Sequence, residues 1–233
     1  MYKKQLVQRL LCDEMEEMVD LTGGFGIDFS YLAPLFRKAI YLEQQEQLCQ
    51  IATHNFNLLD LHHAEIRNTQ AEKELSNINN VSLIYADPAR RDNVGRKVVL
   101  LEDCQPNVIS LQGELLNRSK VVMLKLSPML DIQQALRQLN SVREVHVVSV
   151  DGECRELLLV MYHRKMPLRY ICVNLANTSQ ITEVADDWPK PVICDQVRTF
   201  LYEPNASILK AGVQDALCEQ FKVEKLHPFS HLF

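Results

Sequence analysis

Three acidic side chains each stand directly after a short apolar run, and they are Asp20, Glu43 and Asp87. An apolar run that stops at a polar residue predicts a buried strand with the acid at its carboxyl end. A carboxylate at the tip of the second such strand can accept hydrogen bonds from both hydroxyls of a ribose, and nucleotide-binding α/β folds place an acid there. Glu43 therefore predicts an adenosine-containing ligand, although alone it is also explained as a solvated surface acid.

The first of these acids opens a glycine-rich turn that leads into an amphipathic segment. Only seven glycines occur in the chain, and the turn contains three of them, together with two acids and a threonine: Asp20, Thr22, Gly23, Gly24, Gly26 and Asp28. Glycine permits φ > 0 and a close approach of a ligand to the main chain. The helix that follows points free N–H groups at that ligand. The acid precedes the glycines, so the pattern is not the dinucleotide fingerprint G-x-G-x-x-G. A purely structural turn is the alternative.

The third acid is followed by a proline and then by cations. Pro88 cannot continue a β-ladder, so the strand ends there and Asp87 is fixed at its mouth. Asp87 can accept a proton or a hydrogen bond from a reacting nucleophile. Arg90, Arg91 and Lys125, which lies near the end of a later apolar run, could bind phosphate or another anion. The alternative is a turn-forming Asp-Pro beside solvated charges.

Together these motifs resemble the class I S-adenosylmethionine (SAM)-dependent methyltransferases, and most closely bacterial members with a C-terminal THUMP-like domain. The glycine turn is similar to motif I, residues 87–91 to motif IV, and residues 202–205 to the start of the appended domain. The resemblance implies that SAM contacts Asp20, Thr22, Gly23, Gly24, Gly26, Asp28, Glu43, Gln70 and Asp87. It implies a catalytic set of Asp87, Pro88, Arg90 and Lys125. The family often holds an acid against the adenine amine, whereas this chain offers Thr69 or Gln70, and the sequence leaves that choice open.

The same resemblance limits the classes of methyl-transfer reaction that are expected. Amino-group methyltransferases typically carry Asp/Asn-Pro-Pro-aromatic, whereas Ala89 and Arg90 follow Pro88 here, so no ring is available to stack an extruded base. Uridine C5 methyltransferases need a cysteine nucleophile after the fifth strand, where this chain has Ser127. A covalent pyrimidine mechanism is therefore disfavoured. Direct transfer remains, in which the protein mainly positions the nucleophile in line with the methyl sulfonium.

Hydrophobic periodicity predicts the elements that position these residues. Strands are expected near residues 16–21, 39–43, 64–68, 81–86, 121–126, 145–150 and 157–161. Helices are expected near residues 3–11, 27–36, 44–58, 107–117 and 131–139. The helix over 44–58 is expected to bury Leu48, Ile51, Ala52, Asn55 and Leu59. Asp151-Gly152 between apolar runs predicts a hairpin. The expected fold is α/β, a Rossmann-like seven-stranded sheet whose last strand is antiparallel.

The chain is expected to contain two domains. Residues 1–164 form the SAM-dependent methyltransferase domain, and residues 165–233 form a small α+β unit that resembles a THUMP-like domain. This second unit includes a strand near residues 170–175 and helices near 206–212 and 213–221. The apolar end over residues 229–233 suggests that the sequence is a piece of a longer chain.

Charge, cysteine content and the length of apolar runs limit the partners and the cell compartment that are expected. A net charge of −5 gives no global basic field, so a nucleic-acid partner would need local charge. Seven cysteines without a CxxC pair indicate reduced thiols in a cytoplasmic protein. No apolar run approaches a membrane span. His62-His63 has no companions at metal-ligand spacing, so no metal is expected.

RNA is a partner only by analogy with THUMP domains. Two alternatives stay open: a small-molecule methyltransferase with an accessory lid, and a non-catalytic SAM-binding or interaction module. The sequence does not indicate the oligomeric state.

Overall fold

The computed structural model describes residues 2–88, 101–176 and 179–233 and divides into two compact units. The first unit comprises Met1–Lys125, Gln133–Ser141 and Val160–Arg164. The second unit comprises Leu126–Ile132, Val142–Leu159 and Lys165–Phe233. The expected domain boundary after residue 164 stays a prediction.

The first unit is built on a parallel ladder in the order β3-β2-β1-β4-β5. The strands are β1 (Glu17–Asp20), β2 (Lys38–Glu43), β3 (Ala64–Asn68), β4 (Val81–Ala86) and β5 (Ser119–Leu126). Every residue of β4 and all but the first of β2 and β1 are buried. Parallel strands covered on both faces need such continuous apolar runs.

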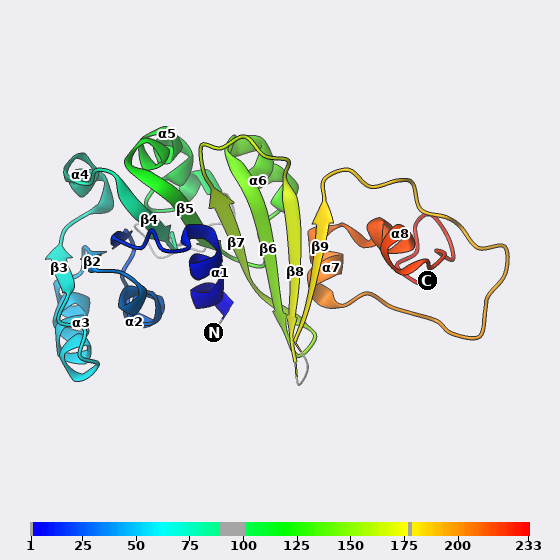
Figure 1. Ribbon diagram of the computed structural model, residues 1–233, viewed down its shortest axis with the longest axis horizontal. Coiled ribbons are helices and arrows are strands. Elements are labelled where there is room, and N and C mark those ends of the chain that lie inside the picture. Colours follow the sequence, from blue (N-terminus) through cyan, green and yellow to red (C-terminus); the bar gives the residue numbers. More distant parts are fainter. Residues whose placement is uncertain (1, 89–100, 177–178) are drawn as a thin grey trace. The chain divides into compact units, whose positions relative to one another are not determined.

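Helices cover both faces of this ladder. They are α1 (Tyr2–Leu11), α2 (Ile27–Leu32), α3 (Glu46–Leu58), α4 (Ala71–Glu74), α5 (Val108–Arg118) and α6 (Ile132–Gln138). Figure 1 shows α1, α2 and α3 on one side of the strands and α4 and α5 on the other. The core therefore has the layered arrangement of an open α/β sheet.

Two predicted helices differ from the structure in detail. The helix expected over 27–36 ends at Leu32, and Pro34 lies in a following 3-10 turn, Ala33–Leu35. Proline lacks the N–H that a continuing α-helix needs, which accounts for the early end.

The predicted buried face of α3 is correct only in part. The helix buries Ala52 as predicted, together with Cys49 and Phe56. Leu48 and Asn55 are half-buried, whereas Ile51 and Leu59 are exposed. The Phe56 ring packs against two aromatic rings of the core, stacked at 5.0 Å from the Phe29 centroid and edge-on at 5.4 Å from that of Tyr41, so the helix face that carries Phe56 is buried.

The second unit has strands in the order β7-β6-β8-β9. They are β6 (Val142–Val150), β7 (Glu153–Met161), β8 (Arg169–Leu175) and β9 (Gln180–Ala185). Asp151 and Gly152, with φ of 49° and 81°, join β6 to β7. A two-residue connection between neighbouring strands requires that they run antiparallel, so the predicted hairpin is confirmed. β8 pairs parallel with β6, and β9 pairs antiparallel with β8.

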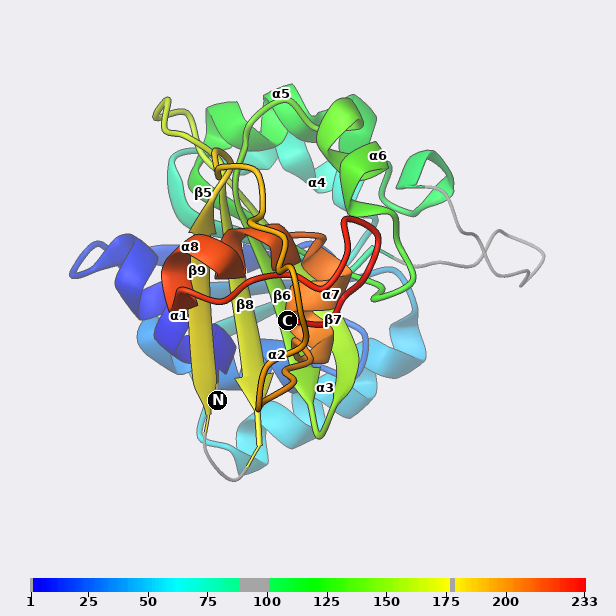
Figure 2. The ribbon, with the colours of Figure 1, turned by 90° about the vertical axis from the view of Figure 1, so that its right-hand side faces the viewer.

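The helices of the second unit are short, namely α7 (Ala206–Ala211) and α8 (Leu217–Phe221). The Asn205 side chain caps α7 by accepting hydrogen bonds from the backbone of Ser207 and Ile208, and Gly212 ends it in the left-handed conformation. Figure 2 shows α7 against the strands β6 and β8. The capped helix near residue 206 agrees with the sequence prediction.

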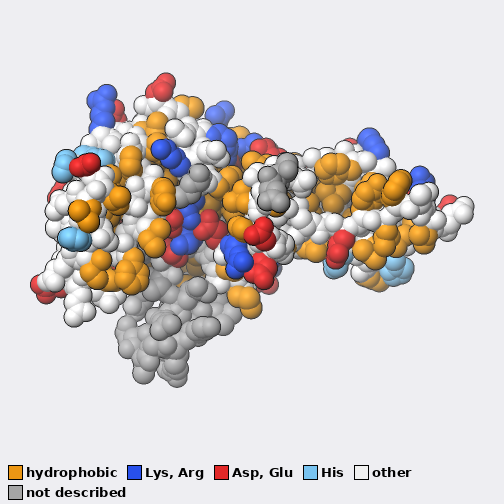
Figure 3. Space-filling model, turned by 90° about the horizontal axis from the view of Figure 1, so that it is seen from below, with side chains coloured by type: hydrophobic (Ala, Val, Ile, Leu, Met, Phe, Trp, Pro, Cys, Tyr) orange, Lys and Arg blue, Asp and Glu red, His pale blue; other side chains and the backbone are white. Residues whose placement is uncertain are grey.

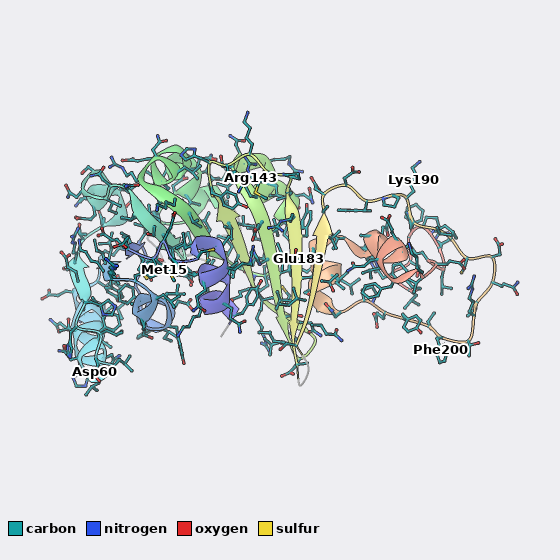
Figure 4. The ribbon with its side chains drawn as sticks, viewed as in Figure 1. Met15, Asp60, Arg143, Glu183, Lys190 and Phe200 are labelled. Atoms are coloured by element: carbon teal, nitrogen blue, oxygen red, sulfur yellow. The ribbon has the colours of Figure 1, made fainter. Side chains whose placement is uncertain are left out.

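The C-terminal part of the second unit exposes large apolar side chains, visible in orange at the right of Figure 3. Phe200, labelled in Figure 4, lies in the long segment that precedes α7 and is 69% exposed. Among the described residues, no helix combines the length and the apolar character that crossing a membrane requires.

Candidate functional site

The three strand-end acids meet at one edge of the first unit. Asp20 ends β1, Glu43 ends β2, and Asp87 follows β4 directly. β1 lies between the other two strands, and Asp20 is in register with Tyr41 on one side and Tyr85 on the other. The predicted placement of the three acids at the carboxyl ends of neighbouring strands is confirmed. Open α/β sheets bind ligands at this edge.

The glycine turn depends on glycine at specific positions. A Cβ atom on Gly23 would lie 2.2 Å from the ring of Tyr41. Gly26 has φ of 72° and precedes α2, and its Cβ would lie 2.8 Å from the ring of Phe56. The turn therefore packs its backbone directly on the aromatic rings beneath it, and larger residues would lift it away from them.

Glu43 ties the tip of β2 to the glycine turn. One carboxylate oxygen, Oε2, accepts a hydrogen bond from Gly24 N at 2.9 Å. The other, Oε1, accepts one from Gln45 N at 2.8 Å. The residue is 8% exposed. Each oxygen retains a second lone pair, so the carboxylate can accept further hydrogen bonds from a ligand while it holds the turn.

Asp20 is buried and bound to its neighbour Thr22. Its Oδ1 accepts from Thr22 N at 2.9 Å and from Thr22 Oγ1 at 3.2 Å. Burial raises the pKa of Asp20 to about 7, although both hydrogen bonds from Thr22 act in the opposite direction. Thr22 Oγ1 also accepts a hydrogen bond from Asp87 N at 2.6 Å. Thr22 therefore joins the ends of β1 and β4.

A chain of alternating charges crosses the site. Asp28, in the first turn of α2, pairs through Oδ1 with Lys3 at 2.9 Å and through Oδ2 with Lys125 at 3.1 Å. The hydroxyl of Tyr85 donates to Asp28 Oδ2 at 2.7 Å. Lys125 Nζ also donates to Asp87 Oδ2 at 2.7 Å. These contacts join α1, α2, β4 and β5 around the strand ends.

Burial and neighbouring charges shift the pKa values of Asp28, Lys125 and Tyr85. Burial alone would raise the pKa of Asp28, but Lys3 and Lys125 outweigh burial and lower it. Burial would lower the pKa of Lys125, but the hydrogen bonds and charges of Asp87 and Asp28 raise it instead. Burial and the nearby carboxylates raise the pKa of Tyr85. The carboxylate of Asp28, the ammonium of Lys125 and the neutral phenol of Tyr85 are thus the favoured states at neutral pH.

These residues surround a cavity of about 1010 Å³ that is open to solvent. Its size suits a ligand of nucleoside dimensions. Of the predicted site residues, those that line it are Asp20, Thr22, Gly23, Gly24, Asp28, Glu43, Gln70, Asp87 and Lys125. Thr69, the alternative to Gln70, lines it as well.

Other predicted residues lie elsewhere. Gly26 and Pro88 are not part of the cavity wall. Arg90 and its neighbour Arg91 fall outside the described residues. The catalytic and cofactor-binding roles assigned from the sequence stay predictions for the whole set.

Sequence reasoning missed two features of the site. Lys3 is 7% exposed and reaches Asp28 from α1. It shares the helix face of Leu6 and Val7, so its position on the apolar stripe was the available signal. The cavity wall also carries three further acids: Glu72, Glu102 and Asp103.

The described wall is strongly acidic. It carries seven carboxyl side chains, and among the described lining residues Lys125 is the one cation. Such a wall favours a positively charged ligand. No cluster of three or more potential metal ligands occurs within the described ranges.

Sequence comparisons identify the C-terminal segment. Residues 200–233 match a family of ferredoxin-like domains. A comparison with curated proteins gives no match.

Many solved structures resemble the chain, and three of them illustrate the range of similarity. A provisionally assigned methyltransferase from Porphyromonas gingivalis W83 has a TM-score of 0.82 and 31% identity over 99% of this chain and 59% of its own. An rRNA methylase from Streptococcus thermophilus has a TM-score of 0.52 and 14% identity over 70% of this chain and 95% of its own. A SAM-dependent methyltransferase from Agrobacterium tumefaciens has a TM-score of 0.53 and 15% identity over 69% of this chain and 60% of its own. The chain spans 59% of the length of the first of these. The predicted Rossmann-like methyltransferase fold is confirmed, although the described residues form a sheet of nine strands instead of the predicted seven.

Proposed function

We propose that the chain is a SAM-dependent methyltransferase whose cofactor occupies the cavity at the carboxyl ends of β2, β1 and β4. The observation that carries this proposal is the cavity itself, where the glycine turn, Asp20 and Glu43 form one hydrogen-bonded wall. SAM carries a net positive charge, which suits the acidic lining. The names of the Porphyromonas and Agrobacterium proteins agree with this function.

The residues present fit the cofactor. The backbone of the glycine turn would lie under the amino-acid portion, and the spare lone pairs of Glu43 would accept the ribose hydroxyls. Thr69 or Gln70 would contact the adenine. When bound, SAM supplies an electrophilic methyl group on its sulfonium.

Asp87 is the proposed group on the acceptor side. Its side chain is 44% exposed and lies at the cavity, where it can accept a hydrogen bond or a proton from the nucleophile. Lys125 donates a hydrogen bond of 2.7 Å to this carboxylate and so helps to orient it. Direct in-line transfer then needs only that the nucleophile be oriented, and Asp87 is placed to do so.

We propose RNA as the acceptor and residues 165–233 as a THUMP-like domain that recruits it. The sequence motifs support this choice, and an rRNA methylase is among the proteins of similar fold. The match of residues 200–233 to ferredoxin-like domains supports the appended unit. A small-molecule acceptor is the second candidate, and the acidic lining favours it, because the ionised carboxylates of the wall would repel phosphates.

Two measurements test the proposal. Calorimetric titration with SAM should give saturable binding, and absence of binding would overturn the cofactor assignment. Tritiated methyl transfer is then assayed with deproteinised total bacterial RNA, with the same RNA after nuclease digestion, and with a low-molecular-weight cell extract. Label in intact RNA alone supports an RNA enzyme. Label in the extract supports the second candidate, and binding without transfer to any pool indicates a non-catalytic SAM-binding protein.

A further inference from the structure

Lys3 is a buried lysine on the core face of the first helix. It is 7% exposed and lies one helical turn from Leu6 and Val7, which are fully packed. Removing an ammonium group from water is strongly unfavourable unless a close partner compensates. The carboxylate of Asp28, at 2.9 Å, is such a partner.

Asp28 links Lys3 to two residues at the cavity. Its Oδ1 pairs with Lys3, while its Oδ2 accepts from both Lys125 and Tyr85. Three donors from three different elements thus fix one carboxylate in the first turn of α2. A carboxylate held in this way cannot rotate without losing at least one charged hydrogen bond.

Lys125 connects Asp28 to Asp87. Its Nζ lies 3.1 Å from Asp28 Oδ2 and 2.7 Å from Asp87 Oδ2. The side chain of Asp87 is 44% exposed, so burial does not fix its rotamer. Among the described residues, the ammonium of Lys125 is the hydrogen-bond donor to the Asp87 carboxylate, and Asp28 is the second anion that holds this ammonium.

We propose that Lys3 and Asp28 are positioning residues, which act through Lys125 to hold the carboxylate of Asp87 at the mouth of the cavity. The inference rests on the proposed function in one respect, namely that Asp87 faces the methyl acceptor. It assigns α1 to the catalytic unit. It also assigns Lys125 to holding carboxylates instead of binding phosphate, because two of its three N–H donors are engaged by Asp28 and Asp87.

The first test follows the reactivity of the Lys125 amine and needs no substrate. Purified variants are acylated briefly with an N-hydroxysuccinimide ester of acetic acid, and the modification at Lys125 is quantified by mass spectrometry. Asp28→Asn removes a stabilising anion and so lowers the pKa of Lys125, which increases the fraction of free amine; acylation of Lys125 should rise by about threefold or more. Lys3→Met leaves Lys125 as the one cation paired with Asp28 among the described residues, and should lower the acylation.

Matched variants separate this effect from general loss of structure. Lys4→Met makes the same charge change on the same helix and should leave Lys125 acylation at the wild-type rate. Lys3→Arg keeps the positive charge, so acylation of Lys125 should return to the wild-type rate. Unchanged acylation in both Asp28→Asn and Lys3→Met, with wild-type thermal midpoints, would overturn the coupling. Acylation raised at every lysine would also overturn it, because that result indicates loosened folding.

The second test follows function. With the acceptor found by the tritium assay, Lys3→Met should lower turnover about tenfold while SAM affinity by calorimetry stays within about twofold, and Lys3→Arg should restore turnover. Equal losses of SAM affinity and turnover would place Lys3 in support of the cofactor site and overturn its positioning role. If the wild-type protein does not bind SAM, the proposed function fails, while the acylation series still decides whether the charge chain is coupled.

Discussion

The backbone N–H of Gly24 donates a hydrogen bond of 2.9 Å to the carboxylate of Glu43. This contact joins the glycine turn after β1 to the tip of β2, so the two motifs act as one structural feature. The acid that we propose as the ribose acceptor therefore also maintains the shape of the turn beneath the cofactor. A change at Glu43 should alter ligand binding and folding together.

Replacing Glu43 by alanine removes a charged acceptor and leaves the N–H groups of Gly24 and Gln45 without it. We expect SAM affinity to fall by about 1.5–3 kcal/mol, since hydrogen bonds to charged groups contribute that much. The thermal midpoint should fall as well. Calorimetry and thermal denaturation of Glu43→Ala measure both, with Glu46→Ala, on the exposed start of α3, as the control. Unchanged SAM affinity would remove Glu43 from the site.

Replacing Gly23 by alanine should be destabilising, because the new Cβ would lie 2.2 Å from the Tyr41 ring. Forced overpacking of this kind typically costs about 1–3 kcal/mol. The matched control is Gly113→Ala in α5, where nothing lies within 4 Å of the added Cβ and the change should stabilise by about 0.5–1 kcal/mol. Urea denaturation of both variants measures the difference.

A double-mutant cycle identifies the cause. If the clash with Tyr41 is responsible, Gly23→Ala should cost much less in a Tyr41→Ala background. The same cost in both backgrounds would show that the backbone of the turn, and not the ring, excludes a side chain at Gly23.

The sequence was most informative where a strand stops at a polar residue. The expected strand over 64–68 coincides with β3, and the three acids lie where the ends of the apolar runs predicted. A strand end is a local event, in which burial ceases and a proline or a glycine turn begins, so neighbouring residues encode it.

Features that depend on packing could not be predicted in this way. The helix α3 carries apolar residues on more than one of its faces. Packing against the rings of Phe29 and Tyr41 selects the face that is buried. β9 is an edge strand whose single buried residue is Val184, so it has almost no apolar pattern. The pairing of Lys3 with Asp28 brings together residues from two helices, and no local pattern encodes it.

The buried Asp20 should make stability depend on pH. Its pKa rises from 3.8 to about 7 in the folded state, so between these values the unfolded chain releases the proton that the folded protein keeps. The contribution of Asp20 to stability is therefore fully present below pH 4 and is lost as the pH rises toward 7. The loss is on the order of 4 kcal/mol.

Asp20→Asn isolates this contribution, because the amide cannot ionise and still offers an oxygen to Thr22. Free energies of unfolding from urea titrations at several pH values between 4.5 and 7.5 should decline more steeply for the wild type than for Asp20→Asn. Parallel curves for the two proteins would contradict the assignment.

Asp87→Asn tests whether Asp87 acts on the acceptor or only on the turn. Its side chain is largely solvated and pairs with Lys125, so the substitution should change the thermal midpoint little. SAM affinity should stay within a few-fold of the wild type, because Glu43 and the glycine turn are untouched. Transfer should fall by about 10²–10⁴-fold, the usual contribution of a general base or positioning group. If Asp87 instead anchors the turn through its N–H to Thr22, both the midpoint and SAM affinity should fall, and that result would exclude the acceptor role even before a substrate is known.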